Sequence, residues 1–501
     1  MILARESLGF KTDAIVNLFQ ALIATTQQQA VDGAAIHKVE ESLFRGLLAL
    51  GLSLLKEFVR VQGSGDQGPT VSLPDQRVVH RFAGRRERSY RSIFGDVTLK
   101  RFVYGSREGQ KIDLSPLDTR LQLPAGEYSY VLQDWAQAFG MEQAWTHVQA
   151  LLATVLGIDV PVDSLERMNQ HMARAVEDFR QEQPVPKPAE EGEIFVVGGD
   201  GKGVPMRRSE HESKPGPHRT KGEKANKKRM AIVGTIYSVK HYRRTPQQIV
   251  AALFEDGPKP EEPRPLPCHK HLWACLTYSE GDEHREGLAE VFGWMTDELA
   301  QRNPNQAKTT VCLMDGQESL WQAQREHLPS PCLEVLDLMH VMPRLWEAAH
   351  AFHPEGSQEA EGFVRDRLLR VLRGESLYVR IGLRQMATKQ GLTGNRRQSI
   401  DRICNYLEAN ARRMCYDWYL AAGYPIASGV LEGACRHYVK DRMERSGMRW
   451  TMAGAQAMLD VRSQWVNGDW KKFQSFRINR ETARLHPHRK LVGQMEWPIA
   501  A

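Results

Sequence analysis

IFVVGGD, residues Ile194–Asp200, is an apolar run that ends in two glycines and an aspartate. A short apolar run of this kind is typical of a buried strand. The pattern recurs in TTVCLM, which precedes Asp315, and in LEVL (Leu333–Leu336), which precedes Asp337. Helical patterns lie between and after these runs. Strands that alternate with helices predict an α/β fold, with a mixed or parallel sheet covered by helices.

Further elements are expected in the same part of the chain. Strand-like runs cover Met230–Val239 and His271–Thr277, and an amphipathic helix covers Gly281–Ala300. Residues 340–420 show mostly helical patterns. The Pro-rich, charged segment Gln183–Glu191 precedes all of these elements and is interpreted as a domain boundary.

Upstream of that boundary the sequence predicts a mainly helical region. Residues 1–60 are interpreted as helical, because apolar residues recur every three or four positions from Ile36 to Leu54, which is the helical period. A Gly/Ser/Pro-rich linker is expected at Gln62–Gln76. Two strand-like runs, Tyr90–Phe94 and Val97–Val103, are separated by Gly95 and Asp96 and predict a β-hairpin.

Residues 142–180 are interpreted as two helices joined by a tight turn. Gly157 is expected to end the first helix, and Asp163 to cap the second. This arrangement favours a helix-turn-helix that binds DNA, although any pair of helices in a bundle would give the same pattern. The outward face of the second helix is expected to contact DNA through Arg167, Asn169, Gln170 and Arg174.

The composition excludes several classes of protein. The 501 residues are 41% hydrophobic and 26% charged, which is typical of a globular chain and not of a disordered one. No apolar run approaches the roughly 20 residues of a membrane span, and no secretion signal is recognised. Seven scattered cysteines without a CxxC pair favour a reducing cytoplasm over a disulfide framework or a zinc site. The motifs HExxH, GxSxG and GxxxxGK[ST] are missing, so zinc-protease, serine-hydrolase and ATP-binding functions are not indicated.

Asp200, Asp315 and Asp337 each follow a strand-like run directly. Side chains at the carboxyl ends of neighbouring strands converge on one crevice. A single aspartate in such a place is explained by a turn or a helix cap, but three in one domain raise the prospect of a metal site. Carboxylate ligands without a His/Cys cluster suit a hard cation such as Mg²⁺ or Mn²⁺.

A fourth carboxylate lies in SGVLEGACRHYVKDRMERSGMRW, Ser428–Trp450. Glu432 falls in the first turn of a predicted helix, where the helix dipole favours an acid. The following cations suit a phosphate backbone, whereas the alternative is a solvated basic helix with local acidic partners. These cations are Arg436, Lys440, Arg442, Arg445 and Arg449.

A second basic segment covers Met206–Arg229, which holds nine Lys/Arg against three Glu. It is longer and more basic than a tight connection between two strands needs. A solvated loop is an equally good interpretation in the absence of DNA. The candidates for phosphate contacts there are Lys224, Lys227 and Lys228.

Three blocks of the sequence resemble the DDE transposases of bacterial insertion sequences, in particular the ISKra group and, more loosely, the Mutator-like transposases. The blocks are GGDGKGVPMR (198–207), LMDGQESLW (313–321) and the Ser428–Trp450 segment, each centred on a carboxylate and in the family's order. The resemblance runs from about residue 80 to 470. It implies an RNase H-like catalytic core with an all-helical insertion before the glutamate, and the helical stretch at 340–420 fits that insertion.

The resemblance also implies roles for individual residues. Asp200, Asp315 and Glu432 would be the catalytic residues that hold two Mg²⁺ or Mn²⁺ ions, while Asp337 and His340 resemble an accessory element. Asp337 remains an alternative to Asp315 as the second ligand. The implied reaction is cleavage of DNA at the ends of an insertion sequence and strand transfer into target DNA, by in-line displacement without a covalent protein intermediate. The implied partners are double-stranded DNA and, on it, further copies of the chain, in the bacterial cytoplasm.

The sequence is also compatible with two rival hypotheses. One is a nuclease on the same fold that cuts DNA without joining it, and the other is a DNA-binding regulator whose core is inert. The expected organisation is an N-terminal helical region with a linker (1–78), a β-hairpin and helix-turn-helix (79–185), the first part of the catalytic core (190–345), a helical insertion (346–420), the core helix with Glu432 (421–475) and a basic tail (476–501).

Overall fold

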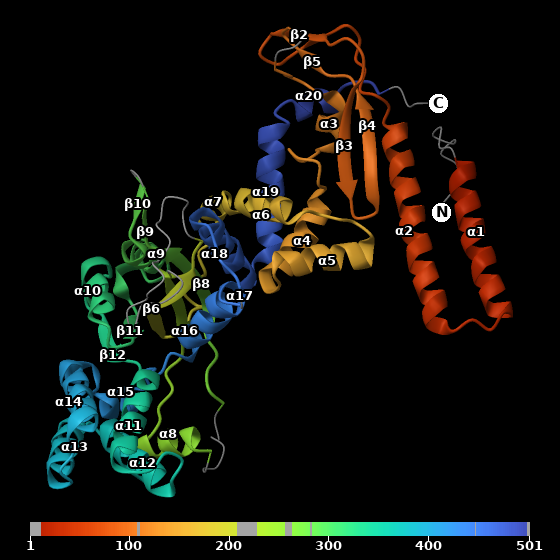
Figure 1. The fold of residues 1–501 in the computed structure, drawn as a ribbon. Coiled ribbons are helices and arrows are strands. Elements are labelled where there is room, and N and C mark those ends of the chain that lie inside the picture. Colours follow the sequence, from red (N-terminus) through yellow and green to blue (C-terminus); the bar gives the residue numbers. More distant parts are fainter. Residues whose placement is uncertain are drawn as a thin grey trace, which may run out of the picture. The chain divides into compact units, whose positions relative to one another are not determined.

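The computed structural model describes residues 12–107, 111–207, 228–255, 263–280, 283–445 and 447–497. The chain divides into two compact units (Figure 1). Unit 1 is Met1–Ala175 together with Trp470–Ala501, and unit 2 is Val176–Asp469. The protein is therefore a mixed α/β protein in which the last segment of the chain returns to the first unit.

Unit 2 contains a mixed five-stranded sheet with the strand order β12-β11-β6-β7-β8. The strands β6 (Ile194–Pro205), β7 (Lys228–Val239) and β8 (Cys268–Leu276) form an antiparallel meander. The strands β11 (Thr309–Met314) and β12 (Leu333–Leu336) continue the sheet parallel to β6. The mixed sheet and all five strands were predicted from the sequence, although β6 runs on beyond Asp200.

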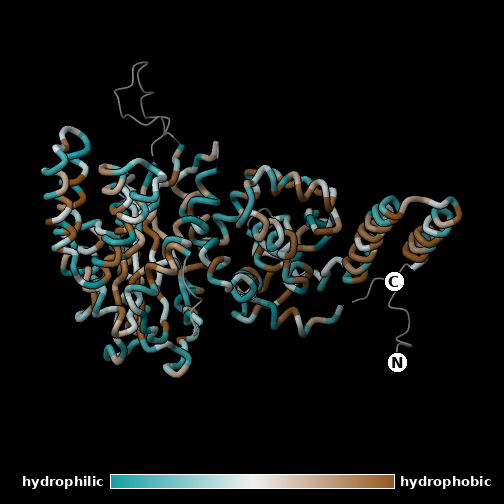
Figure 2. Tube along the Cα trace, turned by 90° about the horizontal axis from the view of Figure 1, so that it is seen from below, coloured by the Kyte–Doolittle hydropathy of each residue, from teal (hydrophilic) through white to brown (hydrophobic). Residues whose placement is uncertain are grey.

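Both faces of this sheet are covered by helices, which explains why its strands are apolar without alternation. Phe195 and Val197 point to one face, against α9 (Gly287–Arg302) and α10 (Glu318–His327). Val196 points to the other face, in a second core that includes the helices after β12. The apolar strands are coloured brown between the helices that cover them (Figure 2).

Residues 338–422 are helical, as the periodicity predicts. A small 3₁₀ turn precedes the last of these helices. Their apolar faces share one core with the sheet, and that core contains Leu345, Leu368 and Ile403. The helices are α11 (Leu338–Phe352), α12 (Gln358–Leu372), α13 (Ser376–Lys389), α14 (Gly394–Ala409) and α15 (Tyr416–Ala422).

The helix expected at Gly281–Ala300 begins later, at Gly287. Glu283–Arg285 (β10) instead pairs with Tyr278–Glu280 (β9) in a small hairpin. A continuous helical segment follows α15 and holds Glu432: α16 (Gly429–Ala434), a π-helical turn (Cys435–Lys440) and α17 (Asp441–Met443). The remaining elements of unit 2 are α7 (Val176–Gln181), α8 (Pro246–Leu253), a 3₁₀ turn (Pro304–Gln306) and α18 (Met452–Val466).

Unit 1 begins with two long helices, α1 (Thr12–Val31) and α2 (Ile36–Val61), which confirm the helical prediction for this region. The predicted hairpin consists of β3 (Arg86–Ser92) and β4 (Gly95–Arg101). Its turn is Ile93–Phe94, two residues earlier than expected, because Ser92 pairs with Gly95. A small sheet made of β1 (Thr70–Ser72), β2 (Val78–Arg81) and β5 (Tyr104–Gly105) was not predicted; its first strand starts inside the expected linker.

The C-terminal segment is helical and packs within unit 1, whereas a basic tail was expected. The buried side chain of Arg477 donates to Gln133 at 3.1 Å, and Trp470 donates to Asp134 at 2.7 Å. No helix among the described residues has both the length and the apolar composition needed to cross a membrane. The helices of this part are α3 (Pro116–Leu121), α4 (Tyr130–Glu142), α5 (Trp145–Leu156), α6 (Val162–Ala173), α19 (Trp470–Leu485) and α20 (Arg489–Gly493).

Candidate functional site

Asp200 and Asp315 lie side by side at one end of the core sheet. The strands β6 and β11 are parallel neighbours, with Cys312 opposite Val197. Three residues further along both strands, this register brings Asp315 level with Asp200. Neighbouring strands lie about 4.8 Å apart, and residues at the same level of parallel strands point to the same face. The two carboxylates are therefore neighbours, even though 115 positions separate them in the sequence.

Asp337 extends the row by one strand. Met314 lies opposite Leu336 in the parallel pair β11–β12, so that the next residues, Asp315 and Asp337, are also level. The backbone N–H of Asp337 donates to the carbonyl of Met314 at 2.8 Å, which holds the two strand ends together. All three predicted aspartates thus occupy one level of the sheet.

Asp315 is half-buried and surrounded by like charge. Its Oδ1 accepts a hydrogen bond from the N–H of Gln317 at 2.8 Å. Burial raises the pKa of Asp315, and the nearby carboxylates of Asp200 and Asp337 raise it further, while Gln317 and His340 oppose that change. A carboxyl held in this way would be stabilised by a nearby cation.

Asp337 has a different environment, because both of its oxygens are occupied. It is buried, and its Oδ1 caps α11 by accepting from the N–H of Met339 at 2.9 Å. Its Oδ2 accepts from the N–H of Ser428 at 3.2 Å and from the Ser428 hydroxyl. Ser428 is the residue before α16, so Asp337 connects the end of β12 to the start of the helix that holds Glu432.

Glu432 lies on a helix that covers the same face of the sheet as Asp200. Gly198 shares that face, two residues before Asp200, and a Cβ atom there would lie 3.2 Å from Leu431. One helical turn after the exposed Glu432, the buried Cys435 lies close enough to Asp200 for the charge of that carboxylate to act on its thiol. Burial, followed by the charges of Asp200 and Glu432, raises the pKa of Cys435. The fold therefore brings the third predicted carboxylate to the side of the sheet on which the first one lies.

As they stand, no three His, Cys, Asp or Glu side chains in the described part of the chain form a group that could hold a metal ion. Within the same residues, neither Asp200 nor Asp315 forms an ion pair. The available donors are carboxylate oxygens, which are the ligands that Mg²⁺ and Mn²⁺ prefer. The chemistry of the donors and the unbalanced negative charge both fit a divalent cation, although the side chains do not enclose one.

Four of the five predicted cations near Glu432 are exposed, and Arg442 is the exception. It is 1% exposed, with its guanidinium 5.0 Å from the centre of the Trp450 ring, so the prediction that it binds DNA is wrong. Because α17 ends at Met443, Arg445 and Arg449 lie beyond the helix on which all five cations were expected. The exposed cations are Arg436, Lys440, Arg445 and Arg449.

The second basic segment is only partly described. Lys224 and Lys227 lie outside the described residues. Lys228 is the first residue of β7, and its ammonium group forms an ion pair with Glu444, which follows α17.

The predicted helix-turn-helix corresponds to α5 and α6, which pack with α4. Gly157 follows α5 with φ 70°, as a helix-ending glycine should. The residue before α6 is Pro161, so the prediction that Asp163 is the cap is wrong; Asp163 lies in the first turn. Asn169 is also corrected, because it is buried and donates to the Gln137 side chain at 3.0 Å. Gln170 is half-buried, and Arg167 and Arg174 are exposed.

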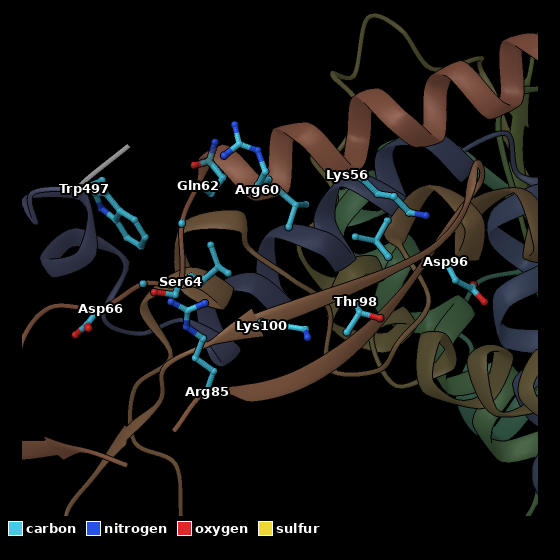
Figure 3. Close-up of a pocket in the computed structure, with 15 residues that line it drawn as sticks. Lys56, Arg60, Gln62, Ser64, Asp66, Arg85, Asp96, Thr98, Lys100 and Trp497 are labelled. Atoms are coloured by element: carbon cyan, nitrogen blue, oxygen red, sulfur yellow. The ribbon is translucent and has the colours of Figure 1, made fainter. Parts of the chain in front are cut away.

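Unit 1 contains a cavity of about 730 Å³, lined by both charged and apolar residues, that the sequence did not reveal (Figure 3). It is lined by residues from the end of α2, the loop that follows, the β3–β4 hairpin and the C-terminal segment, where Trp497 lies. Its residues are distant in the sequence, and no motif links them. The charged residues in its lining are Lys56, Arg60, Asp66, Arg85, Asp96 and Lys100.

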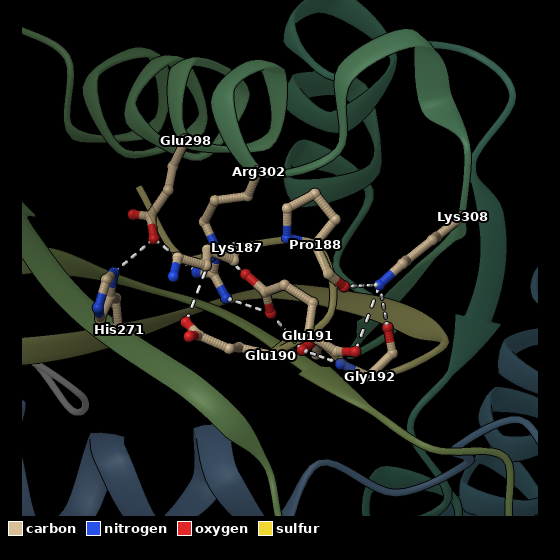
Figure 4. Close-up of polar contacts among 10 residues, drawn as sticks. Lys187, Pro188, Glu190, Glu191, Gly192, His271, Glu298, Arg302 and Lys308 are labelled. Carbon is tan, nitrogen blue, oxygen red and sulfur yellow. Dashed lines mark hydrogen bonds and ion pairs between the residues drawn. The ribbon is translucent and has the colours of Figure 1, made fainter. Parts of the chain in front are cut away.

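Near the start of β6, away from Asp200, the acids Glu191 and Glu298 are paired with Arg302 (Figure 4). Arg302 donates to Glu191 at 2.8 and 3.1 Å and to Glu298 at 2.7 Å. Burial alone would raise the pKa of both glutamates. Hydrogen bonds from Arg302 and Ser238 to Glu191, and from His271 and Arg302 to Glu298, outweigh burial and lower the pKa of each carboxyl.

No family model and no curated protein matches this chain. Among solved structures, the chain is similar to the Drosophila P element transposase strand transfer complex, with 9% sequence identity and a TM-score of 0.22. The match covers 79% of this chain and 90% of that chain.

Proposed function

We propose that the protein is a DDE transposase that cleaves DNA at the ends of an insertion sequence and joins those ends to target DNA. The observation that carries this proposal is the row of aspartates at one level of three neighbouring parallel strands, with the Glu432 helix over the face of Asp200. An antiparallel meander continued by two parallel strands supports the RNase H-like core that the sequence resemblance implies. The helices between β12 and α16 take the place of its insertion.

Asp200, Asp315 and Glu432 are proposed as the metal ligands, and Asp337 as a positioning residue. This choice between Asp315 and Asp337 rests on their hydrogen bonds. The Oδ2 atom of Asp315 accepts no hydrogen bond from a described residue, whereas both oxygens of Asp337 are occupied by Met339 and Ser428. Through Ser428, Asp337 would hold the Glu432 helix against the end of the sheet.

Bound Mg²⁺ or Mn²⁺ would activate the attacking oxygen and stabilise the leaving one. The protein's own contribution is to hold the acids and the DNA strand in place. The exposed side chains of Arg436 and Lys440 follow Glu432 on the same helical segment and would contact phosphates. Arg167 on α6 and Arg174, the residue after it, are proposed to contribute to recognition of the element ends.

The test is a cleavage and strand-transfer assay on linear DNA that carries the sequences flanking the gene, with Mg²⁺ or Mn²⁺. Glu432→Gln should abolish both steps, whereas Asp441→Asn, a control on the same helical segment, should retain them. Pre-cleaved ends separate a transposase from a nuclease, because only a transposase joins them to a second DNA. If Glu432→Gln cuts DNA at the wild-type rate, the assignment is wrong.

A further inference from the structure

The helices α1 and α2 expose an unusual amount of apolar surface. None of the residues of α1 is buried, although the helix is rich in apolar side chains. Of the 26 large apolar residues that are exposed in the described part of the chain, ten lie between Val16 and Phe58. Scattered exposed apolar residues need no explanation, but a concentration of this kind marks an interaction surface.

The composition of α1 is equally unusual. Between Asp13 and Asp32 no residue carries an ionisable side chain. A helix on the surface of a globular protein normally has charged residues on the face opposite the core. The outer face of α1 instead carries apolar side chains together with uncharged Gln, Asn and Thr residues. A helix of this composition is expected to be covered by another protein surface.

Packing between the two helices uses only one face of α1. Leu22 faces Gly46 of α2 so closely that a Cβ at Gly46 would lie 2.5 Å from a Leu22 methyl group. Gln29 accepts from the Ser42 hydroxyl at 3.1 Å on the same side. The half-buried residues of α1 are Ile15, Leu22, Thr26 and Gln29, which lie three, four or seven positions apart. A different face, with Val16, Phe19 and Ile23, remains exposed.

The helix α2 exposes a similar stripe. Phe44, Leu47, Leu54 and Phe58 are 42–54% exposed and are separated by three, seven and four positions, the spacing of a coiled-coil seam. At the position between Leu47 and Leu54, Gly51 faces Phe94, which lies in the turn between β3 and β4. We call the seven exposed residues of the two stripes the hairpin surface: Val16, Phe19, Ile23, Phe44, Leu47, Leu54 and Phe58.

The size of the hairpin surface suits a dimer of modest affinity. A helix of 20 residues is about 30 Å long, and two packed helices present a face about 20 Å wide. One copy would then bury about 600 Å², and a pair of copies about 1,200 Å², which is the lower limit of specific protein interfaces.

We propose that the hairpin surface binds the same surface of a second copy of this chain, so that two α1–α2 pairs form a four-helix bundle. An antiparallel helix pair is half of such a bundle, and a two-fold interface is the commonest one in soluble oligomers. From Ala14 to its end at Val31, α1 carries no charge, which favours a second copy over a charged partner, because two copies bring no like charges together along this stretch. This assembly goes beyond the proposed function, since it requires neither DNA nor metal.

The test is sedimentation of the full-length protein without DNA and with EDTA, over a concentration series from about 0.1 to 50 μM. The wild type should change from monomer to dimer in this range, because an interface at the lower limit of size is expected to bind with a dissociation constant in the micromolar range. Phe19→Glu combined with Ile23→Glu should weaken the dimer by at least about 100-fold, since each buries a charge at the interface. Leu377→Glu combined with Tyr378→Glu, at exposed positions on α13, is the matched control and should leave the dimer unchanged.

Circular dichroism verifies that each variant is folded. If the α1 variant does not fold, Leu47→Glu combined with Leu54→Glu on α2 provides the same test. A wild type that remains monomeric throughout the series would overturn the proposal and indicate a different partner for the hairpin surface. A dimer that persists in both folded double variants would also overturn it. Failure of the metal-site assignment would leave the dimer intact, so the two proposals can fail separately.

Discussion

The two ends of the core sheet differ in whether their acidic residues are paired with cations. At the start of β6, Glu191 is buried against Arg302, whose side chain is 2% exposed and also binds Glu298. At the level of Asp200 further along the same strand, Asp200 and Asp315 are neighbours without an ion pair among the described residues. The pKa is lowered at Glu191 and Glu298 by their hydrogen-bonding partners, and it is raised at Asp315 by burial and by like charges.

This difference separates a structural use of acids from a candidate functional one. A buried carboxylate that is fully matched by arginine contributes to one arrangement of the sheet and has no capacity for a ligand. Acids that are held together without a cation cost stability, and such arrangements are concentrated at functional sites. Asp337 has a structural use, although it lies in the same row as Asp200 and Asp315, because Ser428 and Met339 occupy its oxygens.

The largest effect is expected for Asp200→Asn. The substitution should lower the rate of metal-dependent DNA cleavage by about 10⁴-fold or more, because it removes a ligand of ions that stabilise the transition state by several kcal/mol. DNA binding should be retained, since phosphate contacts come from other residues. A gel assay for cleavage and a mobility-shift assay for binding check both parts. Wild-type cleavage by the variant would remove the contrast between the two ends of the sheet.

The second-largest effect is a loss of stability at the end of the sheet where Arg302 pairs with Glu191 and Glu298. Arg302→Ala should lower the free energy of unfolding by about 4 kcal/mol, because it leaves Glu191 buried without its partner. Arg325→Ala is the control: its ion pair with Glu318 is exposed, and its loss should cost less than about 1 kcal/mol. Urea denaturation measures both variants. Equal stability of the two would contradict the structural role given to Arg302.

Asp337→Ala tests whether one member of the row of aspartates stabilises the fold and does not bind metal. It removes the cap of α11 and the acceptor of Ser428, so the free energy of unfolding should fall by about 2 kcal/mol. Asp337→Asn keeps one acceptor oxygen and should lose less. If Asp337→Ala left stability unchanged but abolished metal binding, Asp337 would replace Asp315 as the second ligand.

The smallest effect is the loss of stability that is expected when the pH is lowered. The pKa values of Glu191 and Glu298 are lower in the folded state than in the unfolded chain. Their contribution to stability is therefore complete above about pH 4.3, the ordinary glutamate value, and is lost as the pH falls through the folded-state values. Thermal unfolding between pH 6 and pH 3 should show this loss, and Glu191→Gln should make the profile shallower. A profile that is equally steep in the variant would show that other groups cause the acid sensitivity.

The sequence predicted the sheet and the carboxylates better than the surfaces. Apolar strand runs are local patterns, so the ends of β11 and β12 before Asp315 and Asp337 could be predicted. The contact between Asp337 and Ser428 could not, because 91 positions separate them and only the fold brings them together. Asn169 and Arg442 were expected at the surface because polarity was taken as exposure, whereas both are buried against partners in tertiary structure. The register that aligns Asp200 with Asp315 likewise depends on strand pairing, which the sequence does not state.

Binding of Mn²⁺, followed by electron paramagnetic resonance in the presence of DNA, tests the central claim most directly. The account predicts that the wild type binds the ion and that Asp200→Asn combined with Asp315→Asn weakens binding by about 100-fold or more, while Glu191→Gln leaves it unchanged. Equal affinity of the wild type and the double variant would contradict the claim that the unmatched end of the sheet is a metal site.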